Sequence, residues 1–185
     1  MRSLNRLGTR PASLPLAADD IVEFHAARLL LLILLCGVAG RIDGLTKMAK
    51  LDFFSRYPDF FEAAAKGQAK GAPARAPAEA VESAMVRHHY GPWDKRYYHV
   101  LAHLEAKHLI QVAKVKKTYV ISLTDLGKER AQRLAEKASF EPLVTRMREI
   151  KKVFGSRTGS SLKNMIYNMF DAEVGRRPLG EMIEK

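Results

Sequence analysis

The sequence has little cysteine, and this limits both its covalent chemistry and its expected environment. Cys36 is the only cysteine among 185 residues, so no intrachain disulfide can form. A chain without disulfides fits a reducing compartment, and we expect a cytoplasmic location. Cys36 lies within an apolar run, which favours a buried small side chain over a reactive thiol.

No apolar run is long enough to suggest a membrane helix. The most apolar stretch, Leu29 to Ala39, falls short of the about 20 residues that a spanning helix needs. Asp19, Asp20 and Glu23 precede it on the same expected helix and separate it from the basic residues near the start, which also argues against a signal peptide. We therefore expect a buried core helix and no membrane partner.

Motifs of common catalytic and metal sites are also missing. His99 and His103 are four residues apart and would share a helix face, but no cysteine or carboxylate completes a ligand set and no HExxH motif is present. Segment 155–161 lacks the lysine and the glycine spacing of a phosphate loop, so a capped helix start is the simpler interpretation. We predict a non-enzymatic protein without metal or cofactor; a hydrolase built on the histidines is the weaker alternative.

Acidic residues are few compared with basic ones. The chain carries 31 lysines and arginines against 20 acidic residues, which gives a formal net charge of +11 and an isoelectric point near 9.9. Such a balance favours a polyanionic partner, which includes nucleic acid and acidic protein surfaces. Hydrophobic residues make up 47% of the chain, enough to build a core, and residues 1–17 are predicted to form a flexible basic arm.

Hydrophobic periodicity and turn residues predict a mainly helical chain with a small β-hairpin. Helices are predicted over residues 18–36, 45–56, 59–66, 93–108, 125–137, 142–154 and 160–170, and strands over 41–43, 85–90, 109–115 and 118–123. The expected N-caps are Asp19 or Asp20, Thr46, Thr124, and Ser160 or Ser161. Gly91 and Pro92 are predicted to form a turn, and residues 67–78, rich in alanine, glycine and proline, a linker.

The order of these elements matches a winged helix: a helix, a short strand, two more helices and a hairpin called the wing. Residues 103–134 read HLEAKHLIQVAKVKKTYVISLTDLGKERAQRL and resemble the strand–turn–strand–LTxxG ending of bacterial winged-helix proteins. We predict a winged-helix domain over residues 18–137 with an insertion at 58–90, followed by a C-terminal helical docking segment over 138–185.

Three further blocks carry a wider resemblance. They read AKLDFFSRYP (49–58), YGPWDKRYYHVL (90–101) and GSSLKNMIYNMF (159–170), and they resemble the accessory, middle subunits of Lamassu-like three-component anti-phage systems, which are encoded beside SMC-like or ABC-type ATPases. The resemblance implies a non-catalytic subunit of an ATPase complex that senses DNA and restrains or positions a nuclease-like effector.

The candidate contact residues follow from these two interpretations. The residues predicted to contact nucleic acid are Lys95, Arg96, His99, Lys114, Lys116 and Lys117. They fall at the start of the expected recognition helix and on the wing, and lysines suit phosphate contact better than base reading. Arg157, Lys163 and Tyr167, on and before the last expected helix, are predicted to contact a protein partner.

Two functions remain open from the sequence. The first is a winged-helix subunit of a DNA-associated ATPase defence complex, which holds the DNA backbone with its wing and a partner with its C-terminal helices. The alternative is a stand-alone transcriptional regulator, which would dimerise to bind a two-fold operator.

Overall fold

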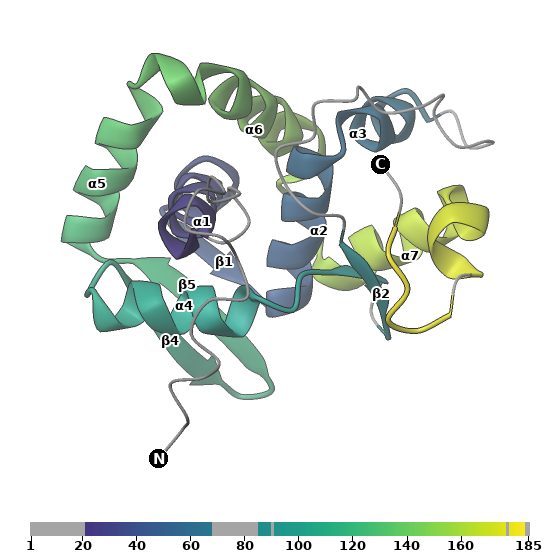
Figure 1. Ribbon diagram of the computed structural model, residues 1–185, viewed down its shortest axis with the longest axis horizontal. Helices are drawn as coiled ribbons and strands as arrows, with labels where there is room; N and C mark the ends of the chain where they lie inside the picture. The colour runs from purple at the N-terminus through teal and green to yellow at the C-terminus, as the bar shows by residue number, and fades with distance from the viewer. Residues whose placement is uncertain (1–20, 68–84, 90, 177, 184–185) are drawn as a thin grey trace, which may run out of the picture.

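The computed structural model describes residues 21–67, 85–89, 91–176 and 178–183, and within them the chain is mainly helical with a small antiparallel sheet (Figure 1). The helices are α1 (Val22–Cys36), α2 (Leu45–Arg56), α3 (Pro58–Ala65), α4 (Tyr97–Ala106), α5 (Asp125–Ala135), α6 (Glu141–Phe154) and α7 (Gly159–Met169), with short helical turns η3 (Ala138–Phe140) and η4 (Asp171–Gly175). The strands are β1 (Arg41–Asp43), β2 (Val86–His88), β3 (Gly91–Trp93), β4 (Ile110–Val115) and β5 (Thr118–Leu123). The predicted basic arm, the Asp19 and Asp20 caps and nearly all of the predicted linker lie outside the described residues.

The main sheet has three antiparallel strands in the order β1-β5-β4. Ile121 is the partner of Ile42 on one side and of Val112 on the other, so these three side chains lie on the same face. Ile42 and Ile121 are buried, which identifies this face as the one that packs against the helices. The predicted strand 41–43 and the predicted hairpin are confirmed.

A second small sheet joins the middle of the chain to its C-terminal segment. β2 pairs with β3, and on its other side the Arg87 amide donates to the Glu181 carbonyl at 2.8 Å. The Tyr57 hydroxyl, at the end of α2, accepts from the Met85 amide at 2.7 Å and donates to the Ile183 carbonyl at 3.2 Å. One buried hydroxyl therefore links α2, the start of β2 and the C-terminal segment.

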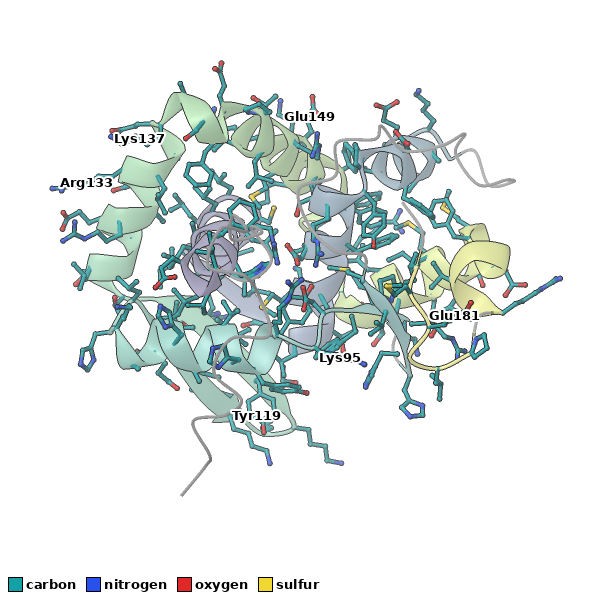
Figure 2. All side chains as sticks on the ribbon, in the orientation of Figure 1. Lys95, Tyr119, Arg133, Lys137, Glu149 and Glu181 are labelled. Atoms are coloured by element: carbon teal, nitrogen blue, oxygen red, sulfur yellow. The ribbon has the colours of Figure 1, made fainter. Side chains whose placement is uncertain are left out.

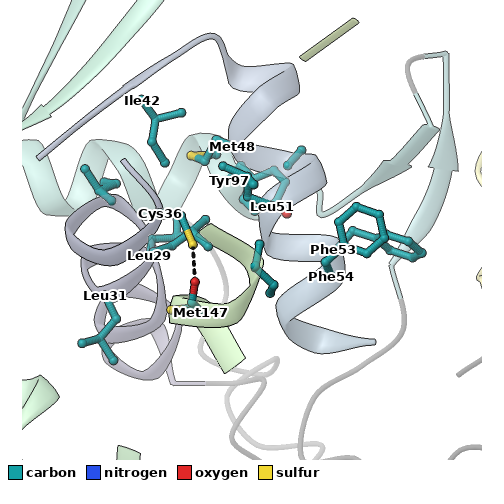
Figure 3. Close-up of a cluster of buried hydrophobic side chains, with 14 of the residues drawn as sticks. Leu29, Leu31, Cys36, Ile42, Met48, Leu51, Phe53, Phe54, Tyr97 and Met147 are labelled. Atoms are coloured by element: carbon teal, nitrogen blue, oxygen red, sulfur yellow. Dashed lines mark hydrogen bonds between the residues drawn. The ribbon is translucent and has the colours of Figure 1, made fainter. Parts of the chain in front are cut away.

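α1 occupies the centre of the molecule, with α2, α4, α5 and α6 around it (Figure 1). Its residues from Leu29 to Ile33 are nearly or wholly inaccessible to solvent. The Cys36 thiol donates to the Met147 carbonyl on α6 at 3.3 Å (Figure 3), and burial raises the pKa of this thiol to about 12. The prediction that Cys36 is buried is confirmed. None of the described helices combines the length and apolar character needed to cross a bilayer.

The LTxxG motif anchors α5 to the end of the hairpin. The Thr124 hydroxyl accepts from the Gly127 amide at 2.9 Å, which confirms the predicted N-cap, and donates to the His108 carbonyl at 2.7 Å. Gly127 lies so close to the chain at Leu109 that an added Cβ would collide with the Leu109 carbonyl oxygen. The glycine is thus required by a close helix–backbone contact.

Two predicted N-caps are wrong, Thr46 for α2 and Ser160 or Ser161 for α7, each because a local contact was not visible in the sequence. α2 begins at Leu45 with Gly44 as its N-cap, because the Gly44 carbonyl accepts from the Met48 amide. The cap of α7 is Thr158, whose hydroxyl accepts from the Ser161 amide at 3.1 Å.

The region of the predicted Gly91-Pro92 turn is different as well. Both residues belong to β3, where the carbonyl of Pro92 accepts from the buried Lys50 ammonium at 2.8 Å. α4 then begins at Tyr97 rather than Trp93, because the Asp94 carboxylate accepts from the Arg96 amide at 2.9 Å and forms a turn ahead of the helix.

Candidate nucleic-acid interface

The β4–β5 hairpin carries three exposed lysines at its tip. Lys114 lies at the end of β4, and Lys116 and Lys117 form the two-residue turn between Val115 and Thr118. Lys116 has φ 55°, a left-handed conformation that the tight turn imposes on a non-glycine residue. None of the three lysines forms an ion pair with a described carboxylate, so their charges face solvent together.

α4 contributes further exposed groups on the same side of the molecule. Lys95 precedes the helix and His99 lies in its first turn, and both are exposed as predicted. In Figure 2, Lys95 and Tyr119 both lie in the lower half of the view. The exposed residues at the tip of the hairpin and at the start of α4 are taken together as one candidate interface, called here the wing surface and defined as Lys95, His99, Lys114, Lys116 and Lys117.

Two exposed tyrosines belong to this region and were not predicted as contact residues. Tyr98 on α4 is 62% exposed and Tyr119 on β5 is 44% exposed. Tyr119 is the cross-strand partner of Lys114. Both side chains therefore lie on the same face of the sheet as Val112 and Ile121, nearer the tip of the hairpin and outside the core. Because the turn has only two residues, it determines which residues of β4 and β5 face each other, and the pairing of Lys114 with Tyr119 could have been predicted from the sequence.

Arg96, in contrast, does not belong to the wing surface. Its guanidinium binds the Asp94 carboxylate through two parallel contacts, Nε to Oδ1 at 2.9 Å and Nη2 to Oδ2 at 2.7 Å. Its Nη1 lies 3.0 Å from the ring Nε2 of His25 on α1. The structure therefore uses Arg96 to hold the start of α4 against α1, and we remove it from the candidate contacts.

The same carboxylate belongs to a buried charge network beneath α4. Asp94 also accepts from Arg56 at 2.8 Å, while Asp52 accepts from Arg28 at 2.9 Å and from the Tyr97 hydroxyl at 2.8 Å. Burial alone would raise the pKa of Asp94, but hydrogen bonds from Arg96 and the charges of Arg56 and Arg96 hold this pKa well below its usual value. These ion pairs fix the position of α4 relative to α1 and α2.

Lys50 is a second buried charge that the sequence did not single out. Its side chain is inaccessible to solvent, and its one described hydrogen bond is to the Pro92 carbonyl. Burial, followed by the nearby charge of Lys163, lowers the pKa of Lys50 to about 7. Its direct neighbours Ala49 and Leu51 are apolar, and this is the only sequence signal that could have identified it.

Of the three residues predicted to contact a partner, Lys163 and Tyr167 lie one turn apart on α7, whereas Arg157 precedes the helix. Lys163 and Tyr167 on α7 are half-buried, and the Tyr167 hydroxyl donates to the His88 carbonyl of β2 at 3.2 Å. Arg157 is exposed before α7, where its guanidinium contacts the Met165 sulfur and lies 5.8 Å from the centre of the Phe154 ring. Tyr167 therefore packs against the β2–β3 hairpin of its own chain.

The apolar side of α7 is covered by the rest of the chain. Leu162, Ile166 and Phe170 are all at most 1% exposed, and Phe170 packs edge-on against Phe60 of α3 at a centroid distance of 4.7 Å. Residues 141–175 thus share one hydrophobic core with α1 and α2. The predicted docking segment is integrated into the fold, and only the polar side of α7 faces outward.

The three sequence blocks that resemble the accessory subunits meet in space. Block 49–58 forms most of α2, block 90–101 contains β3 and the start of α4, and block 159–170 forms α7; α2 packs against both β3 and α7. Lys50 to Pro92 and Arg56 to Asp94 are direct hydrogen bonds between the first two blocks. Much of the resemblance therefore covers residues that build this packing.

The described residues contain no group of three or more histidine, cysteine or acidic side chains placed to hold a metal ion. Comparison of the chain with protein families, curated proteins and solved structures gives no match. The wing surface is therefore interpreted from its own geometry and charge.

Proposed function

We propose that the chain contains a winged-helix module that binds the phosphate backbone of nucleic acid. The element order α1, β1, α2, α4 and the β4–β5 hairpin, with the sheet order β1-β5-β4, supports the winged-helix assignment. α3 and the β2–β3 hairpin form an insertion between the second and third helices of this module.

The observation that carries the binding function is the exposed lysine cluster at the tip of the hairpin. Lys114, Lys116 and Lys117 face solvent without a described carboxylate beside them, and Lys95 adds a fourth exposed ammonium at the start of α4. Ammonium groups of this kind neutralise phosphates and release the counterions that surround nucleic acid. The net charge of +11 favours the same class of partner.

The test is fluorescence anisotropy with a labelled 20-base-pair duplex at several salt concentrations. Four phosphate contacts predict a slope of log K against log salt of about −3.6, from about −0.9 per contact. Replacing Lys114, Lys116 and Lys117 by Glu should weaken binding and reduce the slope to about −0.9. The matched control replaces Lys137, Arg148 and Lys152, all exposed on or near α5 and α6, by Glu. Equal binding by both triple variants, or binding that is independent of salt, would contradict the proposal.

The resemblance of the three blocks supports a second part of the proposal, in which the chain is a subunit of an SMC-like or ABC-type ATPase complex with a nuclease-like effector. Affinity purification from the native host with nuclease treatment tests it. Recovery of an ATPase with the protein supports the subunit role, whereas recovery of DNA alone, together with a dimer in solution, favours the transcriptional regulator.

A further inference from the structure

The outward side of α4 offers few groups that can read a base sequence. Tyr98, Ala102 and Ala106 are exposed and four residues apart, so they form one row along the helix. Alanine has no hydrogen-bonding side chain. The middle and end of this row therefore present methyl groups where a sequence-specific recognition helix would present polar groups.

The side chains that most often read bases are scarce on α4: the helix carries no asparagine or glutamine, and of the exposed polar groups at its start only Lys95 and His99 remain. Arg96 is the only arginine between residues 88 and 129, and its guanidinium is held by Asp94 and His25. The Glu105 carboxylate on α4 accepts from the Val112 amide at 2.9 Å. Bidentate contacts from arginine to guanine and from asparagine or glutamine to adenine are the main sources of direct readout.

Gln111 is the exposed amide nearest to α4 in sequence, and it lies on the other side of the sheet. Successive residues of a strand point to opposite faces, so Gln111 faces away from the side that holds Ile110 and Val112. Its cross-strand partner is Ser122, which in turn pairs with Arg41 on that outer face. Gln111 therefore cannot contact the same groove as the exposed row of α4.

The dimensions of α4 and the hairpin suit a duplex. The ten residues of α4 extend about 15 Å, and a six-residue strand of the hairpin extends about 20 Å. A helix of this size fits the major groove of B-DNA, which is about 12 Å wide, and the hairpin is long enough for its lysines to reach phosphates beside the groove.

We propose that the wing surface binds duplex DNA through its phosphates without a preference for base sequence, with the Tyr98–Ala102–Ala106 row of α4 against the major groove. This inference rests on the proposed function, because it assumes that the lysines of the hairpin contact phosphate. Beyond the proposed function, the inference states that the protein recognises the shape and charge of duplex DNA rather than a particular base sequence.

The first experiment compares the wild-type protein on four unrelated 20-base-pair duplexes and on a single strand of the same length, all at one salt concentration. The expected dissociation constants for the four duplexes agree within about threefold, whereas sequence-specific proteins prefer their site by about a thousandfold or more. Dissociation constants that differ by more than about tenfold among the duplexes, or tighter binding to the single strand, would overturn the inference. The proposed contact between the hairpin lysines and phosphates would still stand. No binding to any of the five, or binding unaffected by the triple lysine substitution, would overturn the proposed function itself.

The second experiment adds a base-reading group to the exposed row. Ala102→Gln should introduce a preference for adenine at one position of the duplex, of about fivefold or more for one bidentate contact. Ala138→Gln, an exposed alanine in η3, is the matched control and should leave binding without preference. If Ala102→Gln binds all duplexes equally, α4 does not lie in the groove and the inference is overturned.

Discussion

At the scale of single residues, the buried charges under α4 distinguish structural from surface cations. Arg96 and Lys95 are neighbours in sequence, yet one is bound to Asp94 and the other is exposed. Lys50 and Lys163 likewise differ, because only Lys50 is completely inaccessible to solvent. The basic excess of the sequence therefore overstates the number of cations available to a polyanion.

Asp94→Asn should lower the stability of the fold sharply. The substitution removes the negative charge that binds Arg56 and Arg96, and loss of one member of a buried ion pair costs about 3–5 kcal/mol. Urea unfolding measures the change. Asp43→Asn is the matched control, because Asp43 pairs with Arg41 at the exposed surface, where such pairs contribute about 0–1 kcal/mol. Equal losses of unfolding free energy in both variants would show that burial does not increase the contribution of the Asp94 ion pairs to stability.

Lys50 should make stability depend on pH above neutrality. Its pKa is about 7 in the folded protein and about 10.5 when unfolded, so between these values the unfolded chain binds a proton that the folded chain lacks. The free energy of unfolding should therefore rise with pH across this window, and fall as pH is lowered towards 7.

Lys50→Met should remove this contribution, because methionine does not titrate. Urea unfolding of the wild type and the variant at pH values from 7 to 10 gives the difference between their slopes. Lys152→Met, on the exposed side of α6, is the control and should keep the wild-type slope. An unchanged slope in Lys50→Met would mean that Lys50 stays protonated in the folded protein.

At the scale of elements, the contact between Gly127 and Leu109 positions α5 after the β4–β5 hairpin. Alanine normally stabilises a helix by about 1 kcal/mol compared with glycine. Here the added methyl group would collide with the Leu109 carbonyl, so Gly127→Ala should destabilise the protein by about 1–3 kcal/mol, as overpacking does. Thermal unfolding measures the loss, with Lys128→Ala at the next, exposed position as control. A stabilised Gly127→Ala variant would show that α5 moves freely relative to the hairpin.

The elements that the sequence predicts well are those whose signals are local. The hairpin follows from the alternation on both sides of Lys116 and Lys117, and the Thr124 cap follows from the LTxxG motif. The error at Arg96 involves a contact between distant residues. His25, which contacts Arg96, is 71 positions away from it in the chain, so no local pattern distinguishes Arg96 from a surface arginine.

At the scale of the whole molecule, the second sheet was predicted only in part: the strand at β2 was expected, but the residues of β3 were predicted to form a turn, and the pairing of β2 with the C-terminal segment is not local. β2 and β3 are only three residues long each, and the pairing of Val86 with Met182 joins segments almost a hundred residues apart. The exposure of the hairpin lysines was easier to predict than this sheet, since it needs no distant partner.

Tyr57→Phe should loosen the connection between these distant segments. The substitution removes the hydroxyl that binds the Met85 amide and the Ile183 carbonyl, and leaving buried groups without partners costs about 1–3 kcal/mol. Hydrogen exchange should become faster at the Met85 amide, which loses its acceptor. Tyr98→Phe, on the exposed face of α4, is the control and should leave this exchange unchanged.

The central position of α1 has a consequence for synthesis of the chain on the ribosome. Met147, whose carbonyl accepts from Cys36 at the end of α1, follows it by 111 residues. At about 5–20 residues per second, the helix emerges roughly 5–20 s before α6 can cover it. During that interval its leucine-rich surface is open to ribosome-associated chaperones, so the rate of translation and the supply of these chaperones should affect the yield of folded protein.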